Sequence, residues 1–301
     1  MGLQDLPLYH PAYWPTWLGL AFMRIITFLP MPVLWVLGTV LGTVMHLIPS
    51  KVRKVVRDNI GLCFPELGGA GQRRLVRQHF RSLGVSMLCY GIAWWASPER
   101  LRRLVRFRDR HHYDSVVASG RSVIVFAPHF LALDVSGITL SSERPYVSMY
   151  RHSRNRLLDS MLLRRGRFGA VLFERKSNLR SLIRHLRDGR PFYYLPDQDA
   201  GAEGVFVPFF GIPAATVTAL SRIAKLADAA VVPCYNSILP WGRGFEVRFE
   251  APLEGFPSGD LEQDARRMND EIEKAIRRNP GQYLWGYRRF KTRPDGSPPL
   301  Y

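Results

Sequence analysis

The segment that most constrains the fold is 122–134, where a short apolar run leads into a histidine and a helical pattern follows. Residues 123–127 are apolar, rich in β-branched side chains and bounded by polar and proline residues, as is typical of a strand buried within a sheet. Residues 130–140 have a helical pattern. A buried strand, a turn and a helix in this order predict an α/β fold, with His129 in the turn.

His129 and Asp134 have a spacing that indicates proton-transfer chemistry. On a continuous helix, residues five apart point about 140° away from each other, so these side chains meet only if His129 lies at or before the first helical turn. In such a pair the imidazole takes a proton from an attacking hydroxyl, and the carboxylate orients the ring. We predict His129 as general base and Asp134 as its partner. The alternative is an ordinary surface or core pair.

Strands and helices alternate over the rest of the chain, and no low-complexity or repeated segment divides it. We therefore predict an α/β fold with a central mixed sheet flanked by helices, in one catalytic domain over 51–301. A helical basic region reaches about Leu104, and a packing helix is expected over 260–278. The predicted strands are 122–127, 146–150, 170–173, 192–195, 231–235 and 245–250.

The amino-terminal residues 1–50 are predicted to form a membrane anchor. Between Trp17 and Ile48 the only formal charge is Arg24. Spanning a bilayer takes about 20 apolar residues, so the uncharged stretch must use residues before Val33 or lie within one leaflet. Pro30 and Pro32 are expected to kink it. A buried core helix is the alternative, and a cleaved signal peptide is disfavoured because no basic region precedes Arg24.

The net charge of +17 indicates an anionic partner. Segment 51–81 has eight Lys/Arg against two acidic residues, and segment 151–190 has twelve against three. The basic cluster at 51–57 directly follows the apolar stretch, which places the rest of the chain on the cytoplasmic side. Nucleic acid is not expected, since no zinc finger, RNP-type sequence or recognition-helix pattern accompanies the charge. A solvated basic face is the alternative for most individual arginines.

The sequence predicts neither a metal site nor a cofactor. Its three cysteines have no metal-ligand or disulfide-framework spacing, and a reducing compartment suits them. Its glycines do not form a phosphate-binding loop pattern.

Further motifs lie before and after the His129 segment in a fixed order and make a family resemblance specific. They comprise an Arg-Asp-Asn-Ile-Gly-Leu-Cys-Phe-Pro block at 57–65, Arg151, the 164–167 arginine cluster, Arg175-Lys176, a Pro-Asp197-Gln-Asp loop, the run 230–235 and a Trp-Gly-Tyr-Arg-Arg-Phe block at 285–290. Together they resemble the lipid A late acyltransferases, the lauroyl and myristoyl enzymes of lipopolysaccharide biosynthesis. The resemblance spans nearly the whole chain.

This resemblance implies a glycerolipid acyltransferase-like fold, an acyl carrier protein as acyl donor, a lipid A precursor as acceptor and a location at the inner membrane among its lipids. Both substrates are anionic, and the planar fork of arginine suits phosphate. We expect Arg165 and Arg167 near the acceptor phosphate or the developing oxyanion, with Arg151 and Arg175 as further candidates. The resemblance suggests that Asp197 positions Arg165 or Arg167 through an ion pair.

Two residues depart from the family pattern. The family usually has Asn before the histidine and often Glu as its partner, where this chain has Pro128 and Asp134. Aspartate serves as partner in related glycerolipid acyltransferases. If the family's Asn supplies a hydrogen bond near the reacting carbonyl, Pro128 has neither a side-chain amide nor a backbone N–H to replace it, and a different donor is then needed.

Three functions are compatible with these observations. The first is a lipid A secondary acyltransferase. The second is an acyltransferase of the same fold acting on a glycerophospholipid, aminolipid or glycolipid. The third is a membrane-bound lipid-binding protein without catalytic activity.

Overall fold

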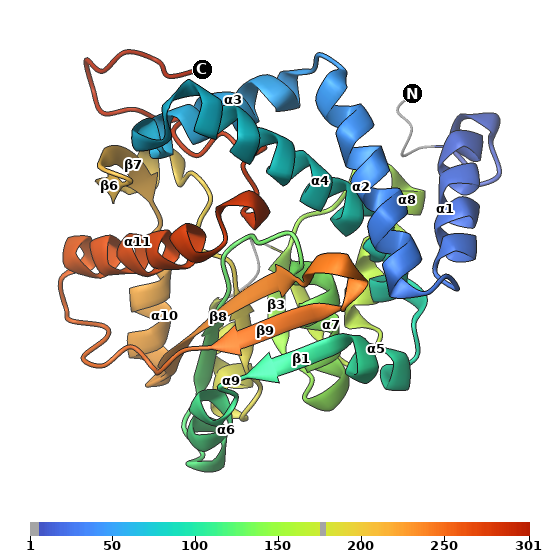
Figure 1. The fold of residues 1–301 in the computed structure, drawn as a ribbon. Coiled ribbons are helices and arrows are strands. Elements are labelled where there is room, and N and C mark those ends of the chain that lie inside the picture. The colour runs from blue at the N-terminus through green and yellow to red at the C-terminus, as the bar shows by residue number, and fades with distance from the viewer. Residues whose placement is uncertain (1–5, 175–178) are drawn as a thin grey trace.

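A seven-stranded mixed sheet forms the centre of the molecule in the computed structural model, which describes residues 6–174 and 179–301 (Figure 1). The strand order is β1-β9-β8-β2-β5-β3-β4, and all neighbours are parallel except β8 and β9. The strands are β1 (Val105–Arg108), β2 (Val123–Phe126), β3 (Val147–Tyr150), β4 (Val171–Glu174), β5 (Phe192–Tyr194), β8 (Ala230–Ile238) and β9 (Phe245–Phe249). The predicted α/β fold with a mixed sheet is confirmed.

All six predicted strands are present in this sheet. The seventh, β1, begins directly after the region expected to be helical and was not predicted, because it is only four residues long and two of those residues are arginines. A separate hairpin of β6 (Val205–Phe209) and β7 (Ile212–Thr216) was also not predicted. Each of its strands contains a proline, which sequence patterns associate with loops.

Helices cover both faces of the sheet, and strand alternation assigns side chains to each face. Ile124 and Phe126 share one hydrophobic cluster with α9, α10 and α11, whereas Val123 and Val125 share another with α5 and α7. The helices are α1 (Trp14–Ile26), α2 (Met31–Leu47), α3 (Lys51–Cys63), α4 (Gly68–Trp95), α5 (Pro98–Leu104), α6 (His111–Ala118), α7 (Leu133–Glu143), α8 (Arg156–Leu162), α9 (Leu179–Arg187), α10 (Ala219–Ala227) and α11 (Leu261–Arg278).

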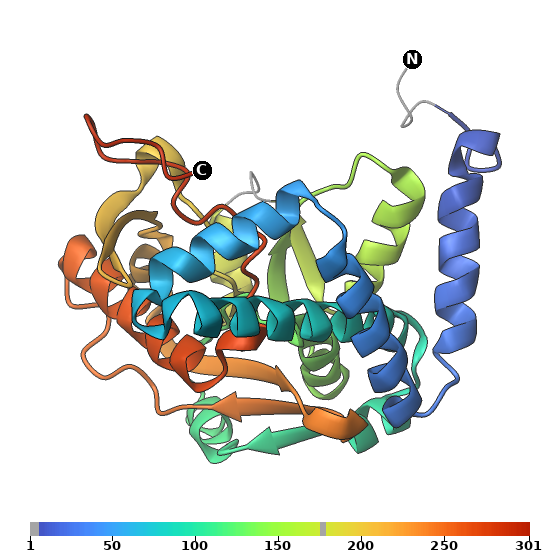
Figure 2. The same cartoon turned by 45° about the horizontal axis from the view of Figure 1, so that its top comes forward.

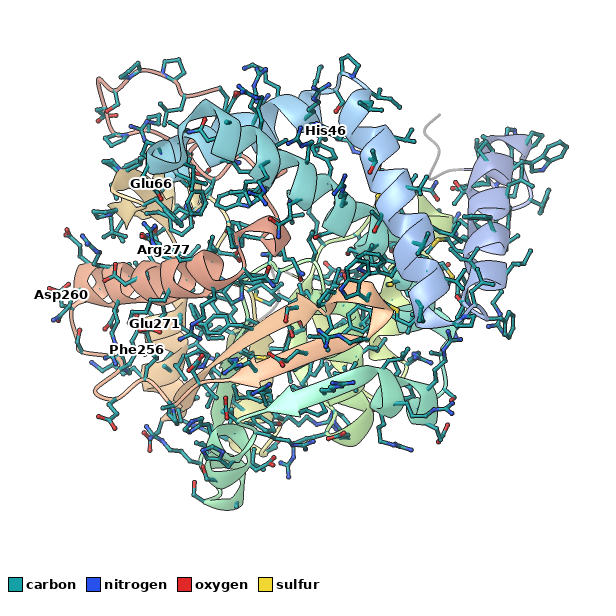
Figure 3. The ribbon with its side chains drawn as sticks, viewed as in Figure 1. His46, Glu66, Phe256, Asp260, Glu271 and Arg277 are labelled. Atoms are coloured by element: carbon teal, nitrogen blue, oxygen red, sulfur yellow. The ribbon has the colours of Figure 1, made fainter. Side chains whose placement is uncertain are left out.

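The predicted helix over 260–278 is confirmed as α11. Asp260 caps it, since its side chain accepts hydrogen bonds from the first-turn nitrogens of Glu262 and Gln263. At the other end, Arg277 lies 3.6 Å from Glu66, in the connection between α3 and α4 (Figure 3). The helix therefore joins the carboxy-terminal part of the chain to the amino-terminal helices.

The long helix α4 runs across the molecule and packs closely against α2 (Figure 2). Glycines permit the approach: a Cβ added to Gly42 would lie 2.0 Å from the Phe80 carbonyl oxygen, and one added to Gly84 would lie 2.2 Å from that of Gly38. Both distances are far below van der Waals contact. The α2–α4 crossing thus requires these glycines.

The amino-terminal apolar stretch forms two helices rather than one. The break falls near the prolines that were expected to kink the stretch: α1 ends at Ile26, Pro30 directly precedes α2, and Pro32 lies in the first turn of α2. Within residues 6–174 and 179–301, none of the helices is by itself long and apolar enough to cross a membrane. The pair α2 and α3 meets that test by length and composition, with a 91° bend between them. A single anchoring helix is therefore not confirmed.

Candidate active site

His129 and Asp197 are brought together by the register of two neighbouring strands. Strands β2 and β5 are parallel, and Phe126 pairs with Tyr194 at their carboxyl ends. His129 and Asp197 each lie three residues beyond that pair. The carboxyl ends of parallel strands are where α/β proteins place their ligand sites.

Asp197 binds His129 through both carboxylate oxygens. Oδ1 lies 2.7 Å from the ring Nδ1, and Oδ2 accepts a hydrogen bond of 2.9 Å from the main-chain nitrogen of His129. The Asp197 side chain is 1% exposed, whereas that of His129 is 21% exposed. Because a carboxylate can only accept, Nδ1 carries the proton in this contact, and the lone pair of the neutral ring lies on Nε2.

The pKa values of His129 and Asp197 shift in the directions that stabilise a charged pair. Burial lowers the pKa of His129, but the charge of Asp197 and its hydrogen bond outweigh burial, so the net pKa is raised. Burial raises the pKa of Asp197, but the charge and hydrogen bonds of His129 outweigh burial. The net pKa of Asp197 is therefore lowered. The pair therefore stabilises the imidazolium that forms when the ring accepts a proton.

The carboxy-terminal segment 282–284 holds the residues around His129. The Leu284 nitrogen donates to the His129 carbonyl at 2.9 Å, and the Leu131 nitrogen donates to Gln282 at the same distance. The hydroxyl of Tyr283 hydrogen-bonds to Asp197 and lowers its pKa further. These contacts keep residues 129–131 out of α7, which begins at Leu133 rather than at the expected residue 130.

Asp134 binds Arg165 instead of His129. Its Oδ1 accepts a hydrogen bond of 2.5 Å from the Arg165 Nε, and the hydroxyl of Tyr90 also hydrogen-bonds to it. Asp134 lies in the first turn of α7, whereas His129 lies before that helix. The carboxylate partners are thus exchanged relative to the expectation, since Asp197 binds His129 and Asp134 binds Arg165. A catalytic role for Asp134 stays a prediction.

Asp134 and Arg165 nevertheless act on His129 through their charges. Asp134 raises the pKa of His129, and Arg165 lowers it. Asp134 also raises the pKa of Arg165, which keeps the guanidinium charged. The ion pair is therefore part of the electrostatic environment of the ring.

Arg167 is a cation without a counterion among the described residues. Its Nε and Nη2 are buried and have no hydrogen-bond partner there, and its guanidinium lies 4.2 Å from the centre of the Phe168 ring. Burial, followed by the charge of Arg164, lowers the pKa of Arg167 to about 10. An arginine in this state has unused hydrogen-bonding capacity for an anion.

The remaining predicted residues are less well placed. Arg151 is exposed one residue beyond β3, and the described residues give it no hydrogen bond or ion pair. Arg175 lies outside the described residues. Asp199 accepts hydrogen bonds from the nitrogen and hydroxyl of Thr292, at 3.2 and 2.8 Å, and so holds the carboxy-terminal segment beside the loop.

Sequence reasoning missed two residues at this site. The Nε2 of Gln198 lies 3.5 Å from the Nε2 of His129, and Tyr283 contacts Asp197 from the far end of the chain. Gln198 lies within the Pro-Asp-Gln-Asp loop, which the sequence analysis had singled out, so its place in that motif could have indicated a role at the site. Tyr283 offered none, because its contact depends on how the carboxy-terminal segment folds back.

Comparisons with known proteins find matches over nearly the whole chain. A family model described as bacterial lipid A biosynthesis acyltransferase matches residues 4–292. The lipid A biosynthesis lauroyltransferase of Escherichia coli strain K12 is 34% identical over 297 residues, which cover 98% of this chain and 97% of the relative. The palmitoleoyltransferase of that strain is 33% identical over 97% of this chain and 96% of the relative, and its myristoyltransferase is 30% identical over 97% and 91%.

Proposed function

The chain belongs to the bacterial lipid A biosynthesis acyltransferase family and is an acyltransferase, and we propose that it transfers a fatty acyl chain from acyl carrier protein to a hydroxyl of a lipid A precursor. The observation that supports this reaction is the His129–Asp197 pair, which leaves the His129 Nε2 as a base at the carboxyl edge of the sheet. The relatives named for lauroyl, palmitoleoyl and myristoyl transfer support the substrate class.

In the proposed mechanism the acceptor hydroxyl gives its proton to the Nε2 of His129 and attacks the carbonyl of the acyl thioester. Asp197 holds the ring in the productive tautomer and stabilises the imidazolium. When the tetrahedral adduct collapses, the carbon–sulfur bond breaks and the imidazolium returns the proton to the departing thiolate. This route needs no serine or cysteine nucleophile.

We assign the arginines to the anionic groups of the acceptor. Arg167 has buried nitrogens that have no hydrogen-bond partner among the described residues, so it is the leading candidate to bind a phosphate. Arg165 is held by Asp134 through its Nε, and within residues 6–174 and 179–301 no hydrogen bond from its terminal nitrogens is found, so we assign these nitrogens to the substrate. Asp134 therefore contributes by positioning Arg165. Arg151 and Arg175 remain further candidates.

Acyl carrier protein as the donor is supported by charge. The chain has a net charge of +17, and segment 151–190, which contains the arginines above, has twelve Lys/Arg against three acidic residues. A strongly acidic carrier protein is attracted by such a surface, mainly through faster association.

Membrane association is supported by the exposed face of α1 and α2. Large apolar side chains protrude there, including Leu18 at 72% exposed, Ile25 at 68% and Val40 at 57%. Arg53, Arg77 and Arg81 place positive charge around His46, in the last turn of α2 (Figure 3). An apolar face bordered by basic side chains matches the chemistry of an anionic bilayer surface. We propose an inner-membrane location with the catalytic part on the cytoplasmic side.

The decisive experiment compares the lipid A of cells that contain the gene with that of cells that lack it, by mass spectrometry. The expected result is the loss of one acyl group, whose mass gives its length, and restoration by the wild-type gene but not by His129→Ala. Unchanged lipid A, with the protein expressed and no redundant enzyme, would contradict the assignment and direct the search to another lipid acceptor. Full activity of a folded His129→Ala protein would contradict the mechanism alone.

A further inference from the structure

The side-chain amide of Gln198 lies beside the atom of His129 that performs the chemistry. Gln198 follows Asp197 in the loop after β5, and its Nε2 is 3.5 Å from the His129 Nε2. Its side chain is exposed, unlike that of Asp197. Asp197 is occupied with the Nδ1 side of the ring, so Gln198 is the neighbour in this loop that faces the Nε2 side.

The main chain around His129 cannot donate hydrogen bonds to a developing oxyanion. Pro128 has no N–H, and the other nitrogens of 127–131 already have acceptors within the protein. Ala127 donates to the Tyr194 carbonyl at 2.9 Å, His129 to the Asp197 carboxylate at 2.9 Å, Phe130 to the Pro128 carbonyl at 2.7 Å and Leu131 to the Gln282 carbonyl at 2.9 Å. A donor to the oxyanion must therefore come from outside this segment.

We propose that Gln198 is a catalytic residue that donates a hydrogen bond from its side-chain amide to the oxyanion of the tetrahedral adduct. This inference rests on the proposed acyl transfer. Both the attacking oxygen and the oxyanion are bonded to the same carbon, and the attacking oxygen starts at the His129 Nε2. A donor that lies 3.5 Å from that nitrogen is consequently within reach of the oxyanion after a small side-chain rotation.

Binding of the acceptor hydroxyl releases the amide for this role. In the neutral ring, the single lone pair of Nε2 can accept from the Gln198 amide nitrogen. The acceptor hydroxyl must occupy that lone pair before it transfers its proton, and after the transfer Nε2 is itself a donor, so the amide has no acceptor there. At the same moment the carbonyl electron pair moves onto the oxygen as the new carbon–oxygen bond forms. The amide therefore loses one acceptor as another appears beside it.

Collapse of the adduct reverses this exchange. The oxyanion re-forms the carbonyl, the carbon–sulfur bond breaks, and the imidazolium proton goes to the thiolate. Nε2 then has its lone pair again and can accept from Gln198. No oxidant, reductant or further co-reactant is needed.

The test measures steady-state kinetics of the purified full-length protein with an acyl-acyl carrier protein and a lipid A precursor, for wild type and Gln198→Ala. Loss of one oxyanion donor is expected to lower kcat and kcat/KM together by about 10²–10³-fold. The substitution changes no charge, so the acidic limb of the pH–rate profile is expected to stay in place. Gln263→Ala, at an exposed glutamine in the first turn of α11, is the matched control with unchanged rates.

Gln198→Glu separates the donor role from a structural one. It keeps the shape but replaces the donor by a carboxylate, so activity is expected to fall at least as far as in Gln198→Ala. Its negative charge beside Nε2 is also expected to shift the acidic limb to higher pH, because it favours the imidazolium. A Gln198→Ala protein within about threefold of wild type would overturn the inference and leave the oxyanion to Arg165 or to backbone groups of the 197–199 loop.

The outcomes also distinguish this inference from the proposed function. If His129→Ala is inactive and Gln198→Ala is active, acyl transfer stands and the role of Gln198 is wrong. If Gln198→Ala loses activity only through a higher KM, the residue binds substrate rather than the oxyanion, and the inference is again overturned. If the wild-type protein transfers no acyl chain to any lipid A precursor, the proposed function is what fails.

Discussion

Asp197 binds both the ring and the main chain of His129, with one carboxylate oxygen 2.7 Å from Nδ1 and the other 2.9 Å from the backbone nitrogen. A bidentate contact of this kind fixes the tautomer and the position of the residue together. The carboxylate that supports the base therefore comes from the loop after β5, 68 residues along the chain from the histidine, and not from the helix that comes next after the histidine.

Asp197→Asn is expected to lower kcat by about 10²-fold or more, because the amide neither holds the productive tautomer nor stabilises the imidazolium. The rate of thiol release from acyl-acyl carrier protein measures this. Asp199→Asn is the matched control two residues away, since Asp199 contacts Thr292 and not the ring. Equal losses in both variants, with equal loss of thermal stability, would show that the loop and not the pair is responsible.

Activity is expected to fall as the pH drops through a value above 6.5, the ordinary pKa of histidine. The base must be neutral, and the charge of Asp197 raises the pKa of His129 despite burial. In Asp197→Asn the residual activity should extend to lower pH, because the raising charge is gone. A pH profile of kcat/KM for both proteins checks the sign of this shift.

The His129–Asp197 pair makes folding stability depend on pH, with stability lost both as the pH rises and as it falls. A histidine with a raised pKa contributes stability that is complete below about 6.5 and lost as the pH rises through its folded value. Asp197, with a lowered pKa, contributes stability above its ordinary range and loses it on acidification. Denaturant unfolding of wild type and Asp197→Asn measures this as a function of pH. The free energies of unfolding of the two proteins are expected to differ most at a pH that lies between the ordinary pKa values of aspartate and histidine.

Asp134→Ala is expected to reduce activity through Arg165, its hydrogen-bond partner at 2.5 Å. If so, Asp134→Ala and Arg165→Ala are not additive, and the double variant is little worse than Arg165→Ala alone. Additive losses in kcat would instead indicate that Asp134 acts on His129 directly. This double-mutant cycle decides between the two roles for the aspartate.

Gly84→Ala is expected to lower the free energy of unfolding by about 1–3 kcal/mol, because the added methyl group overlaps the backbone of α2. Gly19→Ala in α1 is the control, since a Cβ there meets no atom within 4 Å. That change should leave stability unchanged or raise it by about 0.5–1 kcal/mol through helix propensity. Thermal unfolding of the two variants against wild type measures the difference.

Serine substitutions at Val36, Val40 and Leu47 together are expected to weaken binding to anionic phospholipid vesicles, because each side chain is more than half exposed on α2. Co-sedimentation with the vesicles measures this. Leu226→Ser, at a similarly exposed position on α10, is the control. Unchanged sedimentation of the triple variant would contradict a membrane role for this face.

The sequence predicted individual elements better than their mutual positions. The strand before His129 was recognisable because its residues are apolar and β-branched, and the proline-marked break between α1 and α2 was recognisable from Pro30 and Pro32. The partner of His129 was not recognisable. It depends on β5 lying beside β2, and strand order results from packing of the whole sheet rather than from local pattern.

The equal offsets of His129 and Asp197 beyond the β2–β5 pair impose an asymmetry on how this chain can vary. Deleting or inserting one residue at 127–128 or at 195–196 would change one of the two offsets but not the other, and so would move one partner relative to the other. Loops at the other edge of the same strands have no such constraint. Length variation among functional descendants of this chain should therefore concentrate at the amino ends of β2 and β5 and avoid their carboxyl ends.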